Sequence, residues 1–425
     1  MDRIASLSNQ VIRNDTNAFQ GNLFEQVQLA PPDPILGTAL AYKADTSKDK
    51  MNLGVGAYRD DNEKPYPFKV VRKVESQIVN DHSIDKEYLP IDGLAQFNAA
   101  AQQLIFGKDS SAVKEGRVIT SQAISGTGAL RIGFEFLAKF YNREVLVSNP
   151  TWGNHHDIIK CSGLNFKQYR YYNPKNMSLD FNGMFTDISM AKPGSIVLLH
   201  ACAHNPTGLD LTEDQWKRLA GLFKQNRLFP FFDSAYQGFA TGDLNRDAYS
   251  IRLFTELGFQ LIVTQSFAKN MGLYSDRIGA FHLVCANKET AAKCLSQLKL
   301  VIRPMYSNPP AHGARIATKI LTDPALYNEW MEELSMVSKR IIDMRTALKN
   351  ELVRLEVPGN WNHIVTQIGM FSYTGLTPEQ CDILINKYHI YLLKNGRISM
   401  CGITTKNVGY LAAAIKDAVV STQKK

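Results

Sequence analysis

The chain of 425 residues lacks the features that mark membrane-spanning and secreted proteins. No apolar run approaches the roughly 18 residues that a membrane-spanning helix needs. The first residues, MDRIASLSNQVIRNDTNAF, contain no apolar segment of a secretory signal, and they include Asp2 and Asp15, although import sequences for organelles are poor in acids. We therefore expect a cytoplasmic protein without a membrane partner, with mitochondrial import as the weaker alternative.

Paired cysteines are also missing. The six cysteines are scattered, and no two have the CxxC spacing that is typical of zinc sites and redox centres. Neither a disulfide framework nor a metal site is indicated. We expect buried, free thiols in a reducing compartment, and no bound metal.

Concentrated positive charge is the third absence. The formal net charge is +8, but no block of about 5–8 consecutive basic residues occurs, as nucleic-acid-binding patches often have. The basic residues are dispersed, which is typical of a solvated surface. We expect no nucleic-acid partner, and small anionic molecules are the better candidates for ligands.

What the chain does contain is an alternation of strand and helix patterns. Short apolar runs rich in β-formers begin at residues 118, 144, 195, 228, 260 and 279. Helical patterns separate most of them, for example TEDQWKRLAGLFKQN from Thr212. Such alternation predicts an α/β fold with a mostly parallel sheet that is covered on both faces.

The pattern changes after Pro324. Apolar residues then recur every three or four positions from Trp330 to Leu352, which predicts one long amphipathic helix. Shorter mixed elements and a last helix near 406–420 follow, so we expect a second, smaller α+β domain. Residues 1 to about 60 are irregular and are interpreted as an arm that packs elsewhere, for example on a partner subunit.

Four polar clusters follow predicted strands at the point where each strand ends. They are SNPTWGNHH (148–156), HNPTG (204–208), DSAYQGF (233–239) and SFAKN (266–270). Open parallel sheets bind ligands beyond the carboxyl ends of their strands. Four clusters at one edge therefore predict a ligand site there.

Lys269, Asp233 and Arg277 are the most informative residues of these clusters and of the segment that follows the last one. A lysine beside a buried strand must be neutralised, paired or used, and burial lowers its pKa, which frees the amine for Schiff-base chemistry. Asp233 fits either a helix cap or a buried anion that needs a cationic partner. Arg277 fits either an ordinary surface charge or a phosphate clamp.

The segment SGTGALRIG (125–133) places small residues before a helical pattern. Backbone N–H groups at the start of a helix suit a phosphate, although the spacing is not GxGxxG and most glycine pairs are simply turns. A lysine, an acid and a glycine-containing phosphate seat together describe a site for pyridoxal phosphate (PLP).

A family resemblance covers nearly the whole chain. The motifs that carry it are, in order, NLGVGAYR, YLPIDGL, SGTGALR, NPTWGNH, HNPTGLD, DSAYQGF, SFAKNMGLYSDRIG, VIRPMYSNPPAHGARI and NGRISMCG. They closely resemble the aspartate aminotransferase family, among the class I enzymes of PLP-dependent transferase fold type I. The resemblance implies a large PLP-binding domain with a mostly parallel central sheet (61–336), a smaller α+β domain (26–60 and 337–425) and an N-terminal arm (1–25).

The resemblance also implies roles for the residues around the cofactor. Lys269 would hold PLP as a Schiff base and act as general base and acid, while Asp233, supported by His155, would pair with the pyridine nitrogen. Tyr236 and Asn205 would hydrogen-bond the phenolic oxygen of the ring. The further cofactor contacts would be Trp152, stacked on the ring, the phosphate ligands Ser125, Gly126, Thr127, Ser266 and Arg277, and Tyr88 of the neighbouring subunit.

Two arginines would set the choice of substrate. Arg397 would clamp the α-carboxylate, and Arg303 of the other subunit, with Asn308 beside it, would clamp the distal carboxylate through two parallel hydrogen bonds. Without the resemblance, an interdomain salt bridge is the better interpretation of Arg303, and core packing remains open for Trp152. The remaining residues expected at the substrate are Gly56, Trp152 and Asn205. In the family, the prolines of both NP motifs (149–150 and 205–206) are cis.

These roles imply a homodimer with shared active sites. It would transfer an amino group between L-aspartate and 2-oxoglutarate, giving oxaloacetate and L-glutamate. An aromatic or dual-specificity aminotransferase on the same scaffold is the alternative. A PLP-dependent lyase would not need Arg303, and a non-catalytic nucleic-acid binder would not need Lys269.

Overall fold

The computed structural model describes residues 22–31 and 33–423. Most of the predicted N-terminal arm, residues 1–21, lies outside the described residues. Within the described part of the chain, none of the helices combines the length and the apolar character that a membrane crossing requires.

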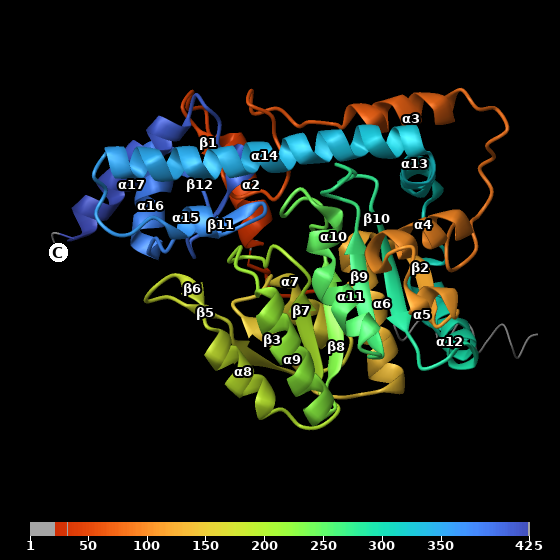
Figure 1. Cartoon of the computed structure of the whole chain (residues 1–425). Helices are drawn as coiled ribbons and strands as arrows, with labels where there is room; N and C mark the ends of the chain where they lie inside the picture. The colour runs from red at the N-terminus through yellow and green to blue at the C-terminus, as the bar shows by residue number, and fades with distance from the viewer. Residues whose placement is uncertain (1–21, 32, 424–425) are drawn as a thin grey trace, which may run out of the picture.

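A seven-stranded mixed sheet forms the centre of the molecule (Figure 1). Its spatial order is β2-β10-β9-β8-β7-β3-β4, and every neighbouring pair is parallel except the two that involve β10. The strands are β2 (Val118–Ile124), β3 (Val145–Asn149), β4 (Phe166–Arg170), β7 (Ile196–His200), β8 (Phe229–Ser234), β9 (Leu261–Ser266) and β10 (Ile278–Val284).

Apolar side chains that alternate along the strands fill both faces of this sheet. In β7, Ile196 and Leu198 belong to the core on one face, and Val197 and Leu199 belong to the core on the other. The first core includes α6 (Ser125–Phe140), α7 (Asn154–Cys161) and α12 (Lys288–Tyr306). The second includes α5 (Ser111–Lys114), α8 (Phe181–Ser189), α9 (Glu213–Asn226) and α11 (Tyr249–Glu256). Burial of both faces explains why these strands are apolar along their whole length.

The long helix α14 (Pro324–Arg354) links the sheet to the C-terminal part of the chain (Figure 1). It begins where Asp323 accepts hydrogen bonds from the first-turn amides, with Pro324 in the first helical position. Its buried face, which includes Trp330, Leu334 and Ile341, belongs to the largest apolar core. The same core contains residues of α3 (Lys69–Val79), α4 (Ala95–Phe106), α10 (Leu244–Asp247) and α13 (Ala311–Thr322).

The C-terminal elements gather with residues from near the N-terminus. The strand β1 (Met51–Asn52) pairs in parallel with β12 (Ile390–Tyr391). Around this pair lie α2 (Pro34–Ala44), α15 (His363–Thr366), α16 (Pro378–Tyr388), α17 (Val408–Gln423), the 3-10 turn η1 (Met400–Gly402) and the antiparallel pair of β11 (Phe371–Tyr373) and β13 (Arg397–Ser399). The short strands β5 (Tyr172–Asn173) and β6 (Ser178–Leu179) form a separate hairpin.

The α/β prediction is confirmed, with a sheet that is mostly parallel. All six predicted strands are present, as are the long helix and the last helix. The edge strand β4 was not predicted, because its sequence FKQYR is mostly polar and three of its five side chains are exposed. The predicted domain boundaries stay a prediction, and α14 continues through the one at 336–337 without a break.

Candidate active site

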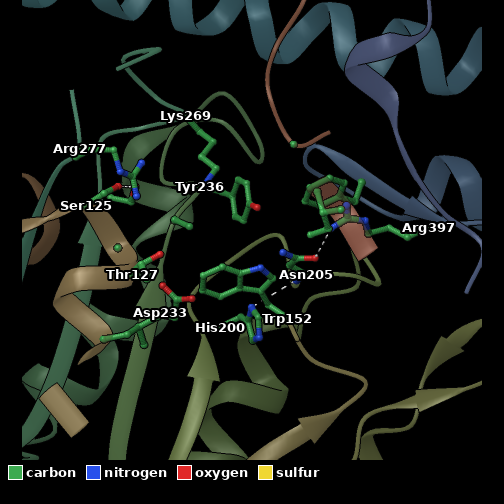
Figure 2. Close-up of a pocket in the computed structure, with 17 residues that line it drawn as sticks. Ser125, Thr127, Trp152, His200, Asn205, Asp233, Tyr236, Lys269, Arg277 and Arg397 are labelled. Atoms are coloured by element: carbon green, nitrogen blue, oxygen red, sulfur yellow. Dashed lines mark hydrogen bonds between the residues drawn. The ribbon is translucent and has the colours of Figure 1, made fainter. Parts of the chain in front are cut away.

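Side chains that follow five strands line a cavity of about 240 Å³ at one edge of the central sheet (Figure 2). The carboxyl ends of the parallel strands meet at this edge, as the positions of the polar clusters predicted. Twelve of the residues singled out from the sequence line the cavity: Gly56, Ser125, Gly126, Thr127, Trp152, Asn205, Asp233, Tyr236, Ser266, Lys269, Arg277 and Arg397.

Asp233, at the end of β8, is supported from behind by a buried histidine. His155 Nε2 lies 3.1 Å from Asp233 Oδ2, and neither side chain is more than slightly exposed. Burial is the largest single influence on Asp233 and opposes its ionisation, but the hydrogen bond and charge of His155 hold its pKa below the usual value. Asp233 is therefore a stable anion at neutral pH, facing the cavity.

Two further residues of this network, Thr151 and His200, were not predicted. The Thr151 hydroxyl lies 2.9 Å from His155 Nδ1 and 3.2 Å from His200 Nε2, so it joins the two imidazoles. Burial lowers the pKa of His200 to about 3, which keeps it neutral. A threonine and a histidine on different strand ends carry no local spacing signal. Only the fold brings them together.

Lys269 enters the cavity from the loop after β9. Its Nζ lies 5.6 Å from the centre of the Tyr236 ring (Figure 2). The pKa of Lys269 is lowered to about 8, chiefly by burial and also by the charge of Arg277, although the charge of Asp233 acts in the opposite direction. This geometry accounts for a lysine behind a buried strand, because roughly a tenth of its population is an uncharged, nucleophilic amine at pH 7, far more than for an ordinary lysine.

One end of the cavity suits a phosphate. There α6 begins, and the N–H groups of a first helical turn have no intrahelical partner and favour an anion. The hydroxyls of Ser125 and Ser266 lie 3.1 Å apart, and the Arg277 guanidinium is on the same side (Figure 2). Gly126 keeps the space open, because a β-carbon there would come within 3.3 Å of Ser266.

Arg397 occupies the other end of the cavity. It is 3% exposed, yet it forms no ion pair with any described residue, and its Nε has no hydrogen-bond partner among them. It donates from Nη2 to Gly54 O at 2.7 Å, and its guanidinium lies 4.0 Å from the centre of the Phe371 ring. Burial lowers its pKa to about 10, so it stays charged. A buried cation without a carboxylate is suited to bind an anionic ligand.

Tyr88, Arg303 and Asn308 lie outside this cavity. Tyr88 is 84% exposed, and it shares a separate surface hollow with Asn308. Arg303 is exposed and donates to the Ser307 hydroxyl. It precedes Tyr306, which also lines that hollow, by about one helical turn. Tyr88 and Asn308 therefore share one hollow of the surface, and Arg303 lies near it along the chain. The two NP peptide bonds are both cis, as expected.

Comparison with known proteins agrees with this arrangement. Residues 48–415 match the family model of aminotransferase class I and II. The chain belongs to this family. It is 54% identical over 394 residues to the mitochondrial aspartate aminotransferase of Xenopus tropicalis, with 92% of each chain covered.

Solved structures of aminotransferases share the fold over their whole length. The aspartate aminotransferase from Saccharomyces cerevisiae cytoplasm superposes with a TM-score of 0.92 at 44% identity, covering 94% of this chain and 99% of that one. The aromatic-amino-acid aminotransferase from Burkholderia pseudomallei, covalently bound to pyridoxal phosphate, gives 0.91 at 41% identity, covering 94% and 100%. The predicted fold type is thereby confirmed.

The burial of Lys269 makes a prediction about its titration. In protein freed of PLP, we expect labelling of its amine by a small acylating reagent to rise with pH to a midpoint near 8, because burial disfavours the charged form. Mass spectrometry of the labelled peptide over a pH series measures this midpoint. Asp233→Asn should lower the midpoint, since the carboxylate favours the ammonium form, and Arg277→Gln should raise it. A midpoint above 10 would mean that the amine is solvated.

Proposed function

We propose that this aminotransferase uses PLP to transfer an amino group between L-aspartate and 2-oxoglutarate, giving oxaloacetate and L-glutamate. The observation that carries the proposal is the arrangement of Lys269, Asp233 and Arg397 around one cavity. A poised amine, an ionised acid and an unpaired buried cation suit an aldehyde cofactor and an amino acid substrate. Aspartate as the substrate follows from relatives that are more than half identical and carry that name.

The cavity fits PLP on the chemistry of its lining. The phosphate would be held by the first turn of α6, by the hydroxyls of Ser125, Thr127 and Ser266, and by Arg277. The ring would lie against Trp152, with Asp233 at its nitrogen and Tyr236 and Asn205 at its phenolic oxygen. When bound, PLP supplies an electron-withdrawing ring that draws charge away from the substrate Cα.

The chain's own residues then divide the work. Asp233, kept ionised by His155, holds a proton at the ring nitrogen. Lys269, once free, removes the proton from the substrate Cα, which its lowered pKa allows near neutral pH. Arg397 binds the α-carboxylate and fixes the orientation of the Cα–H bond, on which the efficiency of proton transfer depends.

The distal carboxylate of a dicarboxylic substrate needs a second cation. Arg277 is committed to the phosphate end and Arg397 to the α-carboxylate, so no arginine is left for it among the described residues that line the cavity. We propose that Arg303 comes from a second copy of the chain, with Asn308 beside it and Tyr88 reaching the phosphate. The exposure of Tyr88 and of Arg303, outside the cavity of their own chain, supports a homodimer with shared active sites.

An aromatic or dual-specificity aminotransferase is the second candidate. It is favoured by the likeness to the aromatic-amino-acid aminotransferase, whose TM-score of 0.91 is close to that of the yeast enzyme. The cytoplasm remains a prediction, since the relatives include mitochondrial and cytoplasmic proteins.

Absorbance tests the cofactor and the reaction together. The purified protein with PLP should show the visible band of a lysine-bound cofactor, and aspartate should remove the band as oxaloacetate appears. Lys269→Ala should lose both the band and turnover, because no other amine among the described residues lines the cavity. Full turnover in this variant would overturn the role of Lys269.

Substrate choice tests Arg303. Arg303→Ala should reduce kcat/KM for aspartate by about one to two orders of magnitude, because a charge-assisted hydrogen bond is worth about 1.5–3 kcal/mol. Activity with phenylalanine, which has no distal carboxylate, should change far less. Equal losses with both amino acids would contradict the distal-clamp role.

Mixed dimers test whether the sites are shared. Lys269→Ala and Arg303→Ala proteins should each be nearly inactive with aspartate, but a hybrid dimer contains one site with both native residues. Random reassociation of equal amounts should restore roughly a quarter of wild-type activity, since about half of the dimers are hybrids with one intact site each. If both residues come from the same chain, no activity returns.

A further inference from the structure

Two segments that are far apart in the sequence run parallel to each other, and the second of them contains Arg397. Residues 51–54 lie alongside residues 389–399, and the contact begins with the parallel pairing of β1 and β12. At the cavity they are linked by the hydrogen bond from Arg397 Nη2 to Gly54 O. Asp45 anchors the outer end of this pairing, since its carboxylate accepts from His389 at 2.7 Å and from Tyr391 at 2.6 Å.

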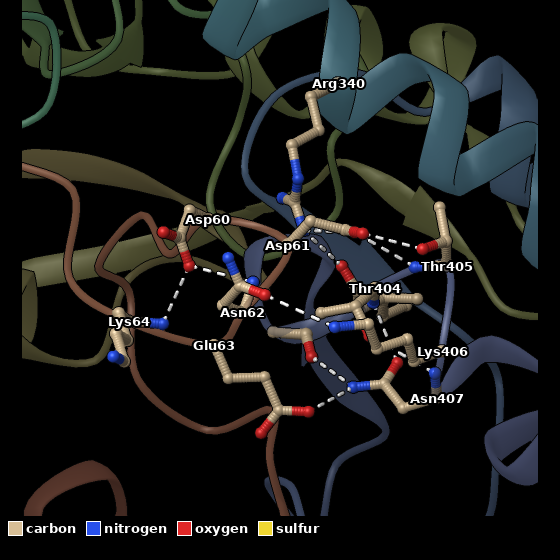
Figure 3. Close-up of polar contacts among 12 residues, drawn as sticks. Asp60, Asp61, Asn62, Glu63, Lys64, Arg340, Thr404, Thr405, Lys406 and Asn407 are labelled. Atoms are coloured by element: carbon tan, nitrogen blue, oxygen red, sulfur yellow. Dashed lines mark hydrogen bonds and ion pairs between the residues drawn. The ribbon is translucent and has the colours of Figure 1, made fainter.

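A second polar contact closes the pairing beyond the cavity (Figure 3). Three consecutive residues of one segment meet three consecutive residues of the other, in parallel. We call this contact the clasp, and its residues are Asp61, Asn62, Glu63, Thr405, Lys406 and Asn407.

The Asp61 side of the clasp is the more fully bonded. Its carboxylate accepts from the Thr405 amide at 3.0 Å and from the Thr405 hydroxyl at 2.6 Å. Arg340 of α14 lies 3.6 Å from Asp61 Oδ1 and donates to Ile403 O at 2.8 Å (Figure 3). The same guanidinium lies 5.6 Å from the centre of the Tyr58 ring. The clasp is thus tied to the long helix and to the segment that borders the cavity.

The Glu63 side of the clasp contains a backbone that would suit glycine better. Glu63 has a φ of 61°, in the left-handed region that side chains disfavour. Its carboxylate accepts from Asn407 Nδ2 at 2.9 Å. Glu356 has a comparable φ of 54°, but it is exposed at the end of α14, away from the cavity. Both glutamates have the same kind of strained backbone, but only Glu63 belongs to the clasp. Substituting each by glycine therefore separates the effect of relaxing the backbone from the effect of losing the clasp contact.

The segment between the clasp and Gly54 faces the cavity. Gly56 lines it, and the Tyr58 amide donates to the Tyr274 hydroxyl at 2.9 Å. Gly54 O accepts from Arg397 Nη2, which helps fix the orientation of the guanidinium at the cavity. Recognition of a carboxylate by a planar fork tolerates little displacement, so the position of Gly54 matters for binding.

We propose that the clasp is a positioning device for the α-carboxylate site. It holds residues 54–58 against Arg397, so that the guanidinium keeps the orientation that binds a carboxylate. The clasp residues do not touch the substrate, and they act through Gly54 and Arg397. The proposal rests on the function proposed above for Arg397.

Substitutions at Glu63 test this idea. Glu63→Gly removes the bond to Asn407 and relaxes the backbone, so the melting temperature should not fall. KM for aspartate, and the dissociation constant of succinate, a dicarboxylate that cannot react, should rise roughly two- to fivefold, the size of one modest hydrogen bond. We expect kcat to stay within about twofold. Glu63→Gln, which keeps an acceptor for Asn407, should behave as wild type.

Glu356→Gly is the matched control. It relaxes the same kind of backbone, so it should leave the melting temperature unchanged or higher, with KM and succinate affinity as in wild type. Thr405→Val removes the hydroxyl bond to Asp61 with little change in volume, and combined with Glu63→Gly it should weaken succinate binding more than either change alone.

The outcomes separate the clasp from the proposed function. If Glu63→Gly binds succinate as tightly as wild type, or if affinity merely follows melting temperature across the variants, the clasp has no positioning role. If wild-type protein fails to transaminate aspartate, the proposed function falls, and the succinate measurements still decide the clasp.

Discussion

The site depends on the protonation states of two side chains in one buried cavity, the Lys269 amine and the Asp233 carboxylate. Burial alone would drive Lys269 and Asp233 towards their uncharged forms. His155 keeps Asp233 ionised, and Asp233 in turn limits how far the pKa of Lys269 falls. The result is an anion and a partly free amine in one cavity, a combination that exposed residues would not give.

The sheet brings these groups together, and that much could be predicted from the sequence. Apolar strands that are each followed by a polar cluster predict Asp233 and Lys269 at one edge of a parallel sheet. The edge strand β4 was missed because its exposed side chains are polar, and hydrophobic pattern is the main signal for strands. Thr151 and His200 were missed because their contact crosses two strand ends.

Other parts of the site came from family resemblance and not from pattern. The segment 125–133 is weak evidence for a phosphate seat on its own, and only the fold shows that α6 begins beside Ser266 and Arg277. The role of Arg303 depends on the family resemblance even more strongly. Nothing in its helical surroundings distinguishes it from a surface charge, because the role proposed for it needs a second copy of the chain.

Arg397 shows how the cavity and the surrounding chain constrain each other. A guanidinium that is 3% exposed and has no acid partner among the described residues should be unfavourable, unless its donors are satisfied and its position is fixed. The Phe371 ring, Gly54 O and Asn205 Oδ1 meet part of that need, and Nε has no hydrogen-bond partner among the described residues. Full satisfaction by the protein would leave no donor for a carboxylate, whereas too little support would let the side chain turn away. Segments that meet at Arg397 are anchored on both sides, at Asp45 and at Asp61, and the shorter of the two hydrogen bonds that orient this cation goes to a carbonyl oxygen between them, Gly54 O.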